Sequence, residues 1–359
     1  MKKFFIMICI LLCSSKLFAA PVNEIIFFGD SLSDDGNLYS ILKVIPRSPP
    51  YYKGRFSNGP TWAELLGNHY KDANHLDSSN YAYGGATAYS HDSGNLFAPM
   101  TLNAEVLEYY ALTLFKDKSD KLYVIWIGGN DYLTEEEMDP EALTEKVIES
   151  IFSAINDLKS KGGQYFLILN LPDLARTPYA AENNLTQRLH LLTTMHNTKL
   201  AKALAEYAAA NPEQKTILVD VYSFFDDLLA HPDQYNQKYQ TQLSNLHQAC
   251  WTGGLTLQSL QTGSQNTPRF HLQAQLLEQN NSALKKYNIR TLSEEILSSP
   301  SLKETYRVAS IKDNGLDPCK QPEQYIFWDL IHPTAPVHQI LAFRVLDTLE
   351  REAKDLLAG

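Results

Sequence analysis

The sequence predicts an α/β fold, a three-layer α/β/α sandwich around a five-stranded parallel sheet, interrupted by one long insertion. Short, nearly continuous apolar runs alternate with amphipathic helical patterns, which is typical of parallel strands covered by helices on both faces. A length of 359 residues and a hydrophobic content of 44% suit one large domain with a sizeable core. A stretch rich in Gln, Asn and Ser breaks the alternation late in the chain and marks the insertion.

Residues 1–19 have the pattern of a secretory signal peptide. Lys2 and Lys3 precede the apolar run Phe4–Leu12, and the segment ends in small residues, so cleavage is expected after Ala19, with cleavage after Ala20 as the alternative. The run is too short to span a bilayer, and a buried N-terminal helix is the alternative. We therefore predict a secreted protein, periplasmic or extracellular, whose mature chain is a single domain of residues 20–359.

Net charge excludes one class of partner. Removal of the leader takes away three lysines and no acid, so the formal charge changes from −10 to −13. Nucleic-acid binding needs clustered Lys and Arg to neutralise phosphates, and the sequence has no basic stripe. We therefore expect no nucleic-acid partner. No other hydrophobic segment approaches the length of a transmembrane helix.

The strands and helices follow in alternation. Five segments are predicted to be strands buried on both faces, namely Glu24–Gly29, Asn80–Gly84, Lys121–Gly128, Gln164–Leu171 and Thr216–Tyr222. Helical periodicity is expected over Thr61–His69, Leu102–Phe115, Pro140–Lys161, Leu185–Ala210 and Val337–Leu357. Ligands of such sheets bind beyond the carboxyl ends of the strands, so reactive side chains are expected there.

The predicted insertion covers about residues 231–324 and has little strand signal. Helices are expected near Phe270–Gln279 and Thr291–Leu297. The insertion also contains Cys250 and Cys319, the two cysteines of the mature chain. An even pair in an exported protein predicts one disulfide, and two unrelated buried thiols are the alternative.

A serine follows the first predicted strand in the segment FFGDSLSDDGN. Ser31 would begin a helix, where free backbone N–H groups can stabilise an oxyanion. A simple turn with a helix cap explains the same residues. Asp30 is expected to hold the turn through backbone hydrogen bonds, whereas Asp34 and Asp35 are expected at a solvated helix start rather than as metal ligands.

Two glycine-rich loops, NYAYGGATA and IWIGGNDYL, contain the second and third candidate groups. Gly85, or Gly84 if the assignment shifts by one, could bring a backbone N–H close to a substrate. Asn130 could donate its side-chain amide to the same point. Ordinary Gly-Gly turns and a helix cap are the alternatives.

The segment FWDLIHPT near the C-terminus contains a base and an acid. A serine hydroxyl becomes a good nucleophile when a neighbouring base accepts its proton, and His332 could be that base. Asp329 could reach the other imidazole nitrogen and fix its tautomer. Asp131 competes for this role, but Asp329 is preferred because its reach to His332 is local. An Asp-x-x-His pair by itself can also be structural.

In this order, the four motifs resemble those of the GDSL family of SGNH hydrolases. The resemblance implies the flavodoxin-like SGNH fold, a triad of Ser31, His332 and Asp329, and an oxyanion hole formed by Ser31, Gly85 and Asn130. The strings FGDSLSDDGN, PPYYKGRFSNGPTW and FWDLIHPT are most similar to exported bacterial phospholipases A and lysophospholipases related to glycerophospholipid:cholesterol acyltransferase. In that branch a cysteine pair often brackets a loop before the last motif, as Cys250 and Cys319 would. No metal and no organic cofactor is implied.

The function that these observations predict is a secreted serine esterase acting on lipid carboxylic esters, as a phospholipase A or lysophospholipase, with a sterol as a further acyl acceptor. The expected partners are a phospholipid or lysophospholipid substrate, a lipid surface contacted peripherally, and an activating protease. A carbohydrate acetyl esterase or a short-chain or aryl esterase is the alternative. A non-catalytic binding protein with the same fold is the third hypothesis.

Arg55 and the aromatic residues in and around the segment KGRFSNGP each allow a functional and a structural interpretation. Arg55 could contact a lipid phosphate or form an ion pair in a surface loop. Nearby aromatic residues could line an acyl groove or fill the core, namely Tyr51, Tyr52, Phe56 and Trp62. His338 is expected to be structural.

Overall fold

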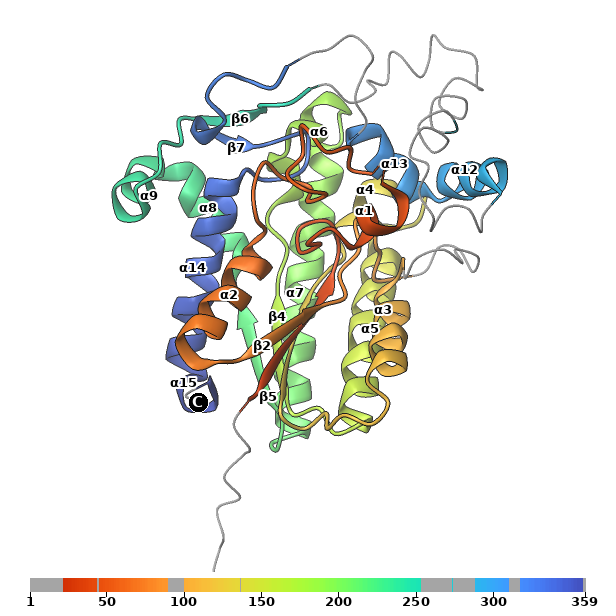
Figure 1. Cartoon of the computed structure of the whole chain (residues 1–359), viewed down its shortest axis with the longest axis vertical. Helices are drawn as coiled ribbons and strands as arrows, with labels where there is room; N and C mark the ends of the chain where they lie inside the picture. Colours follow the sequence, from red (N-terminus) through yellow and green to blue (C-terminus); the bar gives the residue numbers. More distant parts are fainter. Residues whose placement is uncertain are drawn as a thin grey trace, which may run out of the picture.

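The computed structural model of the chain describes residues 22–43, 45–89, 100–135, 137–252, 273, 288–309 and 317–357. The predicted signal peptide and, apart from Gln273, the helix expected near Phe270–Gln279 lie outside these residues. A parallel five-stranded sheet with the order β2-β1-β3-β4-β5 forms the centre, with helices on both faces (Figure 1). The predicted fold class is therefore confirmed.

The strands of the central sheet are β1 (Glu24–Gly29), β2 (Asp77–Asn80), β3 (Lys121–Trp126), β4 (Tyr165–Leu169) and β5 (Lys215–Val219). The three inner strands β1, β3 and β4 are buried along their whole length. The edge strands β2 and β5 have exposed residues, so burial on both faces is a wrong prediction for these two. Each edge strand has only one strand neighbour, and polar residues are tolerated there.

The second strand lies earlier in the chain than predicted. The polar residues Asp77–Asn80 form it, while the following aromatic residues run alongside β1 as a loop. In this loop the Tyr81 and Tyr83 N–H groups donate to the carbonyls of Phe27 and Gly29, at 2.8 and 3.0 Å. The apolar character of the predicted segment therefore reflects burial next to β1 rather than regular strand geometry.

Helices pack in two layers (Figure 1). Helices α2 and α14 pack together on one side of the sheet, and α3, α5 and α7 pack in a row on the other. The helices that precede the insertion are α1 (Asn37–Leu42), α2 (Trp62–Asn74), α3 (Leu102–Leu112), α4 (Gly129–Thr134), α5 (Pro140–Ser160), η1 (Leu174–Arg176), α6 (Pro178–Glu182), α7 (Thr186–Ala210) and α8 (Val221–Ala230). Within the predicted insertion lie α9 (Pro232–Tyr239), α12 (Ile289–Ser298), α13 (Pro300–Ala309) and η3 (Pro322–Gln324), and after it come α14 (Ala335–Glu352) and α15 (Lys354–Leu357).

Sequence signals explain where the long helices begin. Thr61 and Glu64 form a capping box at the start of α2, and Thr101 caps α3. Asp139 caps α5, and the proline that follows it occupies the first turn. These helices all begin within one residue of their predicted starts.

The described part of the insertion contains more regular structure than predicted. Strand β6 (Asn245–Ala249) pairs in parallel with β7 (Tyr325–Phe327) to form a small second sheet. Helix α12 confirms the helix expected near Thr291–Leu297, whereas β6 and α13 were not predicted. The Cys250–Cys319 disulfide is present, and the Cys319 N–H also donates to the Cys250 carbonyl at 2.8 Å. The two ends of the insertion are thus joined beside β7, directly before the His332 loop.

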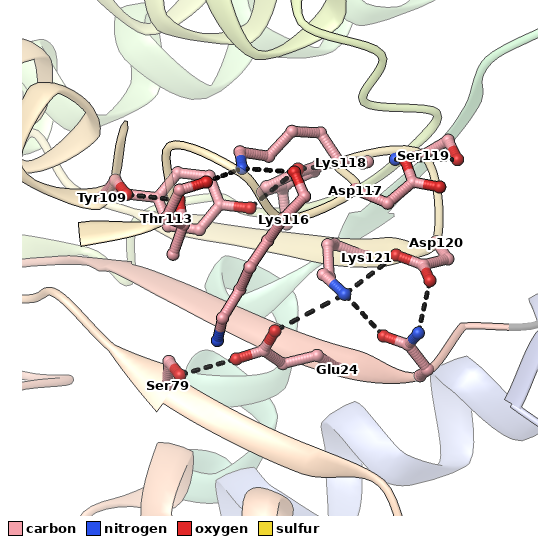
Figure 2. Close-up of polar contacts among 12 residues, drawn as sticks. Glu24, Ser79, Tyr109, Thr113, Lys116, Asp117, Lys118, Ser119, Asp120 and Lys121 are labelled. Carbon is pink, nitrogen blue, oxygen red and sulfur yellow. Dashed lines mark hydrogen bonds and ion pairs between the residues drawn. The ribbon is translucent and has the colours of Figure 1, made fainter. Parts of the chain in front are cut away.

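The amino end of the sheet is closed by a polar network (Figure 2). The Lys121 ammonium group contacts Asn23, Asp120 and Glu24, at 2.6, 2.8 and 3.5 Å. Nearby, the Lys118 ammonium group donates to the carbonyls of Thr113 and Lys116, at 2.5 and 2.8 Å, and so closes the end of α3. The four sequence motifs lie at the opposite, carboxyl edge. Within the described ranges, no helix is both long and apolar enough to cross a membrane.

Candidate active site

The candidate site lies where the sheet changes direction. Strands β1 and β3 are neighbours, but the chain leaves them toward opposite edges of the sheet, which opens a crevice at their carboxyl ends. Ser31 follows β1 and Asn130 follows β3. Helices α1, α4 and α13 and strands β6 and β7 occupy this end of the molecule (Figure 1). The topology therefore brings the first and third motifs together.

Three side chains form one chain of hydrogen bonds. His332 Nε2 lies 2.7 Å from Ser31 Oγ, although 301 positions separate the two residues. His332 Nδ1 lies 2.7 Å from Asp329 Oδ2 and 2.9 Å from Oδ1. A carboxylate can only accept here, so we assign the proton to Nδ1, which leaves Nε2 free to accept the serine hydroxyl proton. The three residues are buried, at 6%, 3% and 1% exposure for Ser31, His332 and Asp329.

Internal hydrogen bonds stabilise the loop that carries Asp329 and His332. Asp329 Oδ1 accepts the backbone N–H groups of Ile331 and His332, at 2.8 and 2.7 Å. The Trp328 N–H donates to the His332 carbonyl at 2.8 Å, and the Ser57 hydroxyl donates to the Pro333 carbonyl at 2.9 Å. The GRFSNGP segment therefore supports the loop from outside, and the Phe56 ring lies 5.1 Å from the imidazole ring.

The serine lies in a single turn rather than at a helix start. The N–H groups of Ser33 and Asp34 donate to the Asp30 carbonyl, and helix α1 begins only at Asn37. The prediction of a helix beginning at Ser31 is therefore wrong. Asp30 Oδ1 accepts the Leu32 N–H at 3.0 Å, which confirms its expected role in the turn. Among the described residues the Ser31 N–H has no hydrogen-bond partner, so it is available to a ligand.

The NYAYGGATA loop is held from two sides. The Gly84 N–H donates to Asp34 Oδ2 at 2.7 Å, so this group is already occupied. Gly85 has a φ of 81°, which favours glycine, and its N–H has no partner in the part of the chain that the structure describes. Of the two glycines, Gly85 is thus the one with a free donor.

The third motif holds the far end of the same loop. One N–H of the Asn130 amide donates to the Ala86 carbonyl at 2.8 Å, which orients the side chain and leaves its second N–H to donate elsewhere. Asp131 accepts the N–H groups of Ala88 and Tyr89, at 2.8 and 2.9 Å. Its carboxylate therefore supports the loop, whereas Asp329 is the acid that contacts His332.

Buried carboxyl groups surround the nucleophile turn. Burial raises the pKa of Asp34 and of Asp131 to about 7, although the hydrogen bonds that these carboxylates accept from backbone N–H groups lower the pKa in part. Burial likewise raises the pKa of Asp30 to about 6. Asp34 is fully buried, so its expected position at a solvated helix start is wrong.

Helix α13 covers the Gly85 corner of the site. A Cβ added to Gly85 would lie 2.9 Å from Thr305 Oγ1 and 3.4 Å from Leu302 Cδ2. Both α13 residues are buried, and α13 packs against α4. A side chain at position 85 would therefore push against α13, and a bound ester would have to share this space.

The other candidate residues have structural partners. Arg55 forms a two-pronged ion pair with Glu64, with N–O distances of 3.0 and 2.5 Å, which confirms the ion-pair alternative. His338 is buried, and its Nδ1 accepts the Trp62 N–H at 3.3 Å, as expected of a structural residue. Tyr51 contacts Asp329, a role that its position in an aromatic-rich loop did not indicate.

Comparisons with known proteins identify the family of the chain. The GDSL-like lipase/acylhydrolase family matches residues 25–345. The chain is 31% identical over 325 residues to a phosphatidylcholine-sterol acyltransferase of Aeromonas hydrophila, covering 89% of this chain and 88% of that protein. It is 23% identical over 336 residues to the thermolabile hemolysin of Vibrio parahaemolyticus, covering 91% of this chain and 64% of that protein.

A solved carbohydrate acetylesterase of Sinorhizobium meliloti, Est24, covers 55% of this chain and 84% of its own at 17% identity, with a TM-score of 0.36. The family model that matches the chain defines the class, which is that of the lipases and acylhydrolases. The chain belongs to the GDSL-like lipase/acylhydrolase family, and it has acyltransferase-type relatives.

Proposed function

We propose that the chain is a secreted serine esterase that cleaves acyl esters of phospholipids or lysophospholipids. The observation that carries the proposal is the hydrogen-bonded chain from Ser31 through His332 to Asp329 at the β1/β3 crevice. Lipid esters are favoured because the Aeromonas relative, which this chain matches over 89% of its length, is a phosphatidylcholine-sterol acyltransferase.

The acylation step uses the contacts described above. Ser31 Oγ attacks the ester carbonyl carbon as its proton passes to His332 Nε2. The negative charge that develops on the carbonyl oxygen is stabilised by the N–H groups of Ser31 and Gly85 and by the Asn130 amide. Collapse of this intermediate breaks the ester C–O bond. The leaving alkoxide takes the proton from Nε2 and departs as an alcohol, and the acyl group stays on Ser31.

Deacylation repeats the sequence with a second nucleophile. Water loses a proton to His332 Nε2 and attacks the acyl carbon. Collapse returns the proton to Ser31 Oγ and releases the fatty acid. A sterol hydroxyl in place of water gives a sterol ester, so hydrolysis and acyl transfer differ only in the acceptor. Neither step requires a metal or an organic cofactor.

Export is part of the proposal. The predicted signal peptide of residues 1–19 directs the chain out of the cytoplasm. The Cys250–Cys319 disulfide supports this, because such bonds persist in oxidising compartments. The sterol acceptor and the activating protease stay predictions.

The test is product analysis with a matched pair of variants. The mature chain is incubated with diacyl and lyso phosphatidylcholine, with and without cholesterol, and separately with acetylated xylan. We expect fatty-acid release that is lost in Ser31→Ala. A fluorophosphonate probe should label the wild type and Ser33→Ala, a buried serine of the same turn, but not Ser31→Ala. Acetate release without fatty acid would favour the acetyl esterase, and absence of both labelling and hydrolysis would favour the binding protein.

A further inference from the structure

A tyrosine outside the four motifs contacts the acid of the proposed triad. The Tyr51 hydroxyl donates to Asp329 Oδ2 at 2.7 Å, across 278 positions of the sequence. Both side chains are only 1% exposed. Because water is excluded from this contact, a hydrogen bond to the carboxylate is stronger here than it would be at the surface.

We propose that Tyr51 is a positioning residue for ester hydrolysis: its hydroxyl fixes the Asp329 carboxylate so that Asp329 holds His332 in line with Ser31. This inference rests on the function proposed above and assigns a further residue to the same reaction. Tyr51 does not touch the reacting atoms and acts through Asp329.

The division of contacts on the carboxylate explains why a further donor is needed. Oδ1 is held by two backbone N–H groups, those of Ile331 and His332. Oδ2 lies 2.7 Å from His332 Nδ1 and 2.7 Å from the Tyr51 hydroxyl. If Tyr51 were absent, Oδ2 would be positioned by the same ring that it has to orient. The carboxylate could then turn about its Oδ1 side, and the imidazole would turn with it.

Tyr51 is itself held in place. Its ring packs edge-on against Trp328, which precedes Asp329, with centroids 6.2 Å apart, and lies 6.3 Å from the Phe56 ring. Phe56 in turn lies against the His332 ring. The Ser48 hydroxyl donates to the Tyr51 carbonyl, which anchors the backbone. The hydroxyl is therefore presented to Asp329 by a packed aromatic cluster.

The protonation state suits a donor. Burial, with the nearby negative charge of Asp329 as a second cause, raises the pKa of Tyr51 well above its usual value. Tyr51 thus keeps its proton over the pH range in which an esterase of this kind would be assayed. A phenylalanine at this position would fill the same space but leave Oδ2 without its second donor.

The first experiment is the substitution Tyr51→Phe, which removes one oxygen atom and keeps the ring. With p-nitrophenyl butyrate as substrate, we expect kcat to fall about 10- to 100-fold and KM to stay within about twofold, as for the loss of a hydrogen bond to a charged group. Tyr70→Phe is the control, because Tyr70 is a buried tyrosine on α2. Its kcat should equal that of the wild type. Rates are divided by the concentration of active sites, titrated to completion with the fluorophosphonate, so that misfolded protein does not count.

A double-mutant cycle separates positioning from general packing. If Tyr51 acts through Asp329, then Tyr51→Phe should change kcat by less than about twofold in an Asp329→Asn background, because the group it positions is already gone. Multiplication of the two losses would overturn the inference, and so would a single Tyr51→Phe variant with wild-type kcat. These outcomes presuppose a wild type that hydrolyses the ester and is labelled at Ser31. A wild type that does neither contradicts the proposed function itself.

Discussion

Asp34 links the nucleophile turn to the loop that carries Gly85, and its replacement by Asn gives the sharpest prediction. Its Oδ1 accepts the N–H groups of Gly36 and Asn37, at 2.7 and 2.5 Å. Its Oδ2 accepts those of Gly84 and Leu38, at 2.7 and 3.2 Å. The substitution Asp34→Asn replaces one of these oxygens with an amide group that can only donate, so two backbone N–H groups lose their acceptor.

The expected size follows from those contacts. If the new amide side chain of Asp34→Asn keeps its oxygen at the Oδ1 position, the two hydrogen bonds from Gly36 and Asn37 remain and the hydrogen bond from the Gly84 N–H is lost. Gly84 is the residue before Gly85, the proposed oxyanion donor. Complete loss of one oxyanion donor costs about 10²–10³-fold in kcat, so we expect a fall of about 10²-fold with little change in KM. Two buried N–H groups without acceptors should also lower the free energy of unfolding by about 2–6 kcal/mol.

The effect should depend on pH. Burial raises the pKa of Asp34 to about 7, so the wild-type group is a carboxylate above that pH and a neutral acid below it. The neutral acid resembles the amide more closely. The ratio of wild-type to variant kcat should therefore be largest near pH 8 and should shrink as the pH falls through about 7.

The assay is hydrolysis of p-nitrophenyl butyrate between pH 6 and pH 9, combined with urea unfolding. Asp35→Asn is the matched control, because Asp35 is the next residue but is only partly buried. Its kcat should stay close to that of the wild type. An Asp34→Asn variant that is folded, yet has kcat within about threefold of the wild type at pH 8, would refute the view that Asp34 positions the Gly85 donor.

Three further predictions concern single groups. Asn130→Ala should lower kcat about 10²–10³-fold without unfolding the chain, as judged by kinetics and circular dichroism. Burial lowers the pKa of His338 from 6.5 to about 3, so stability is present above pH 6.5 and is lost as the pH falls toward 3. Between about pH 6 and pH 4, the unfolding free energy of the His338→Gln variant should therefore fall less steeply with decreasing pH than that of the wild type, by about 1.4 kcal/mol per pH unit. Urea unfolding at each pH measures this slope, and equal slopes for the two proteins would contradict the prediction. Replacement of Cys250 and Cys319 by Ser should reduce the free energy of unfolding by about 4 kcal/mol, because the bond closes a loop of about 70 residues; an unchanged urea midpoint would contradict the estimate.

The core of the fold was predictable because its signals are local. The inner strands β1, β3 and β4 are continuous apolar runs, and α5 begins at a capping aspartate followed by proline. These features describe a segment in isolation. The edge strand β2 and the insertion strand β6 are polar, and each is a strand only because it pairs with a neighbour far away in the sequence. Local patterns do not contain that information.

The candidate site divides in the same way. Ser31, Gly85, Asn130, Asp329 and His332 could be selected from the sequence, because each motif pairs a reactive or donating group with a glycine, a turn or a strand end. Asp34 and Tyr51 could not. The first looks like an ordinary helix start and the second like a core aromatic, and only their contacts with Gly84 and Asp329 distinguish them.

By itself, the sequence determined the fold class and the candidate groups: the parallel sheet, the order of the four motifs and the residue types that can supply a nucleophile, a base, an acid and oxyanion donors. The tertiary structure alone decided how these groups are held. It buries Asp34 against the Gly85 loop, places the Tyr51 hydroxyl against Asp329 Oδ2 and packs α13 over Gly85. The physical reason is that hydrogen bonds and burial depend on distances between segments up to 301 positions apart, which only the packing of the whole chain establishes.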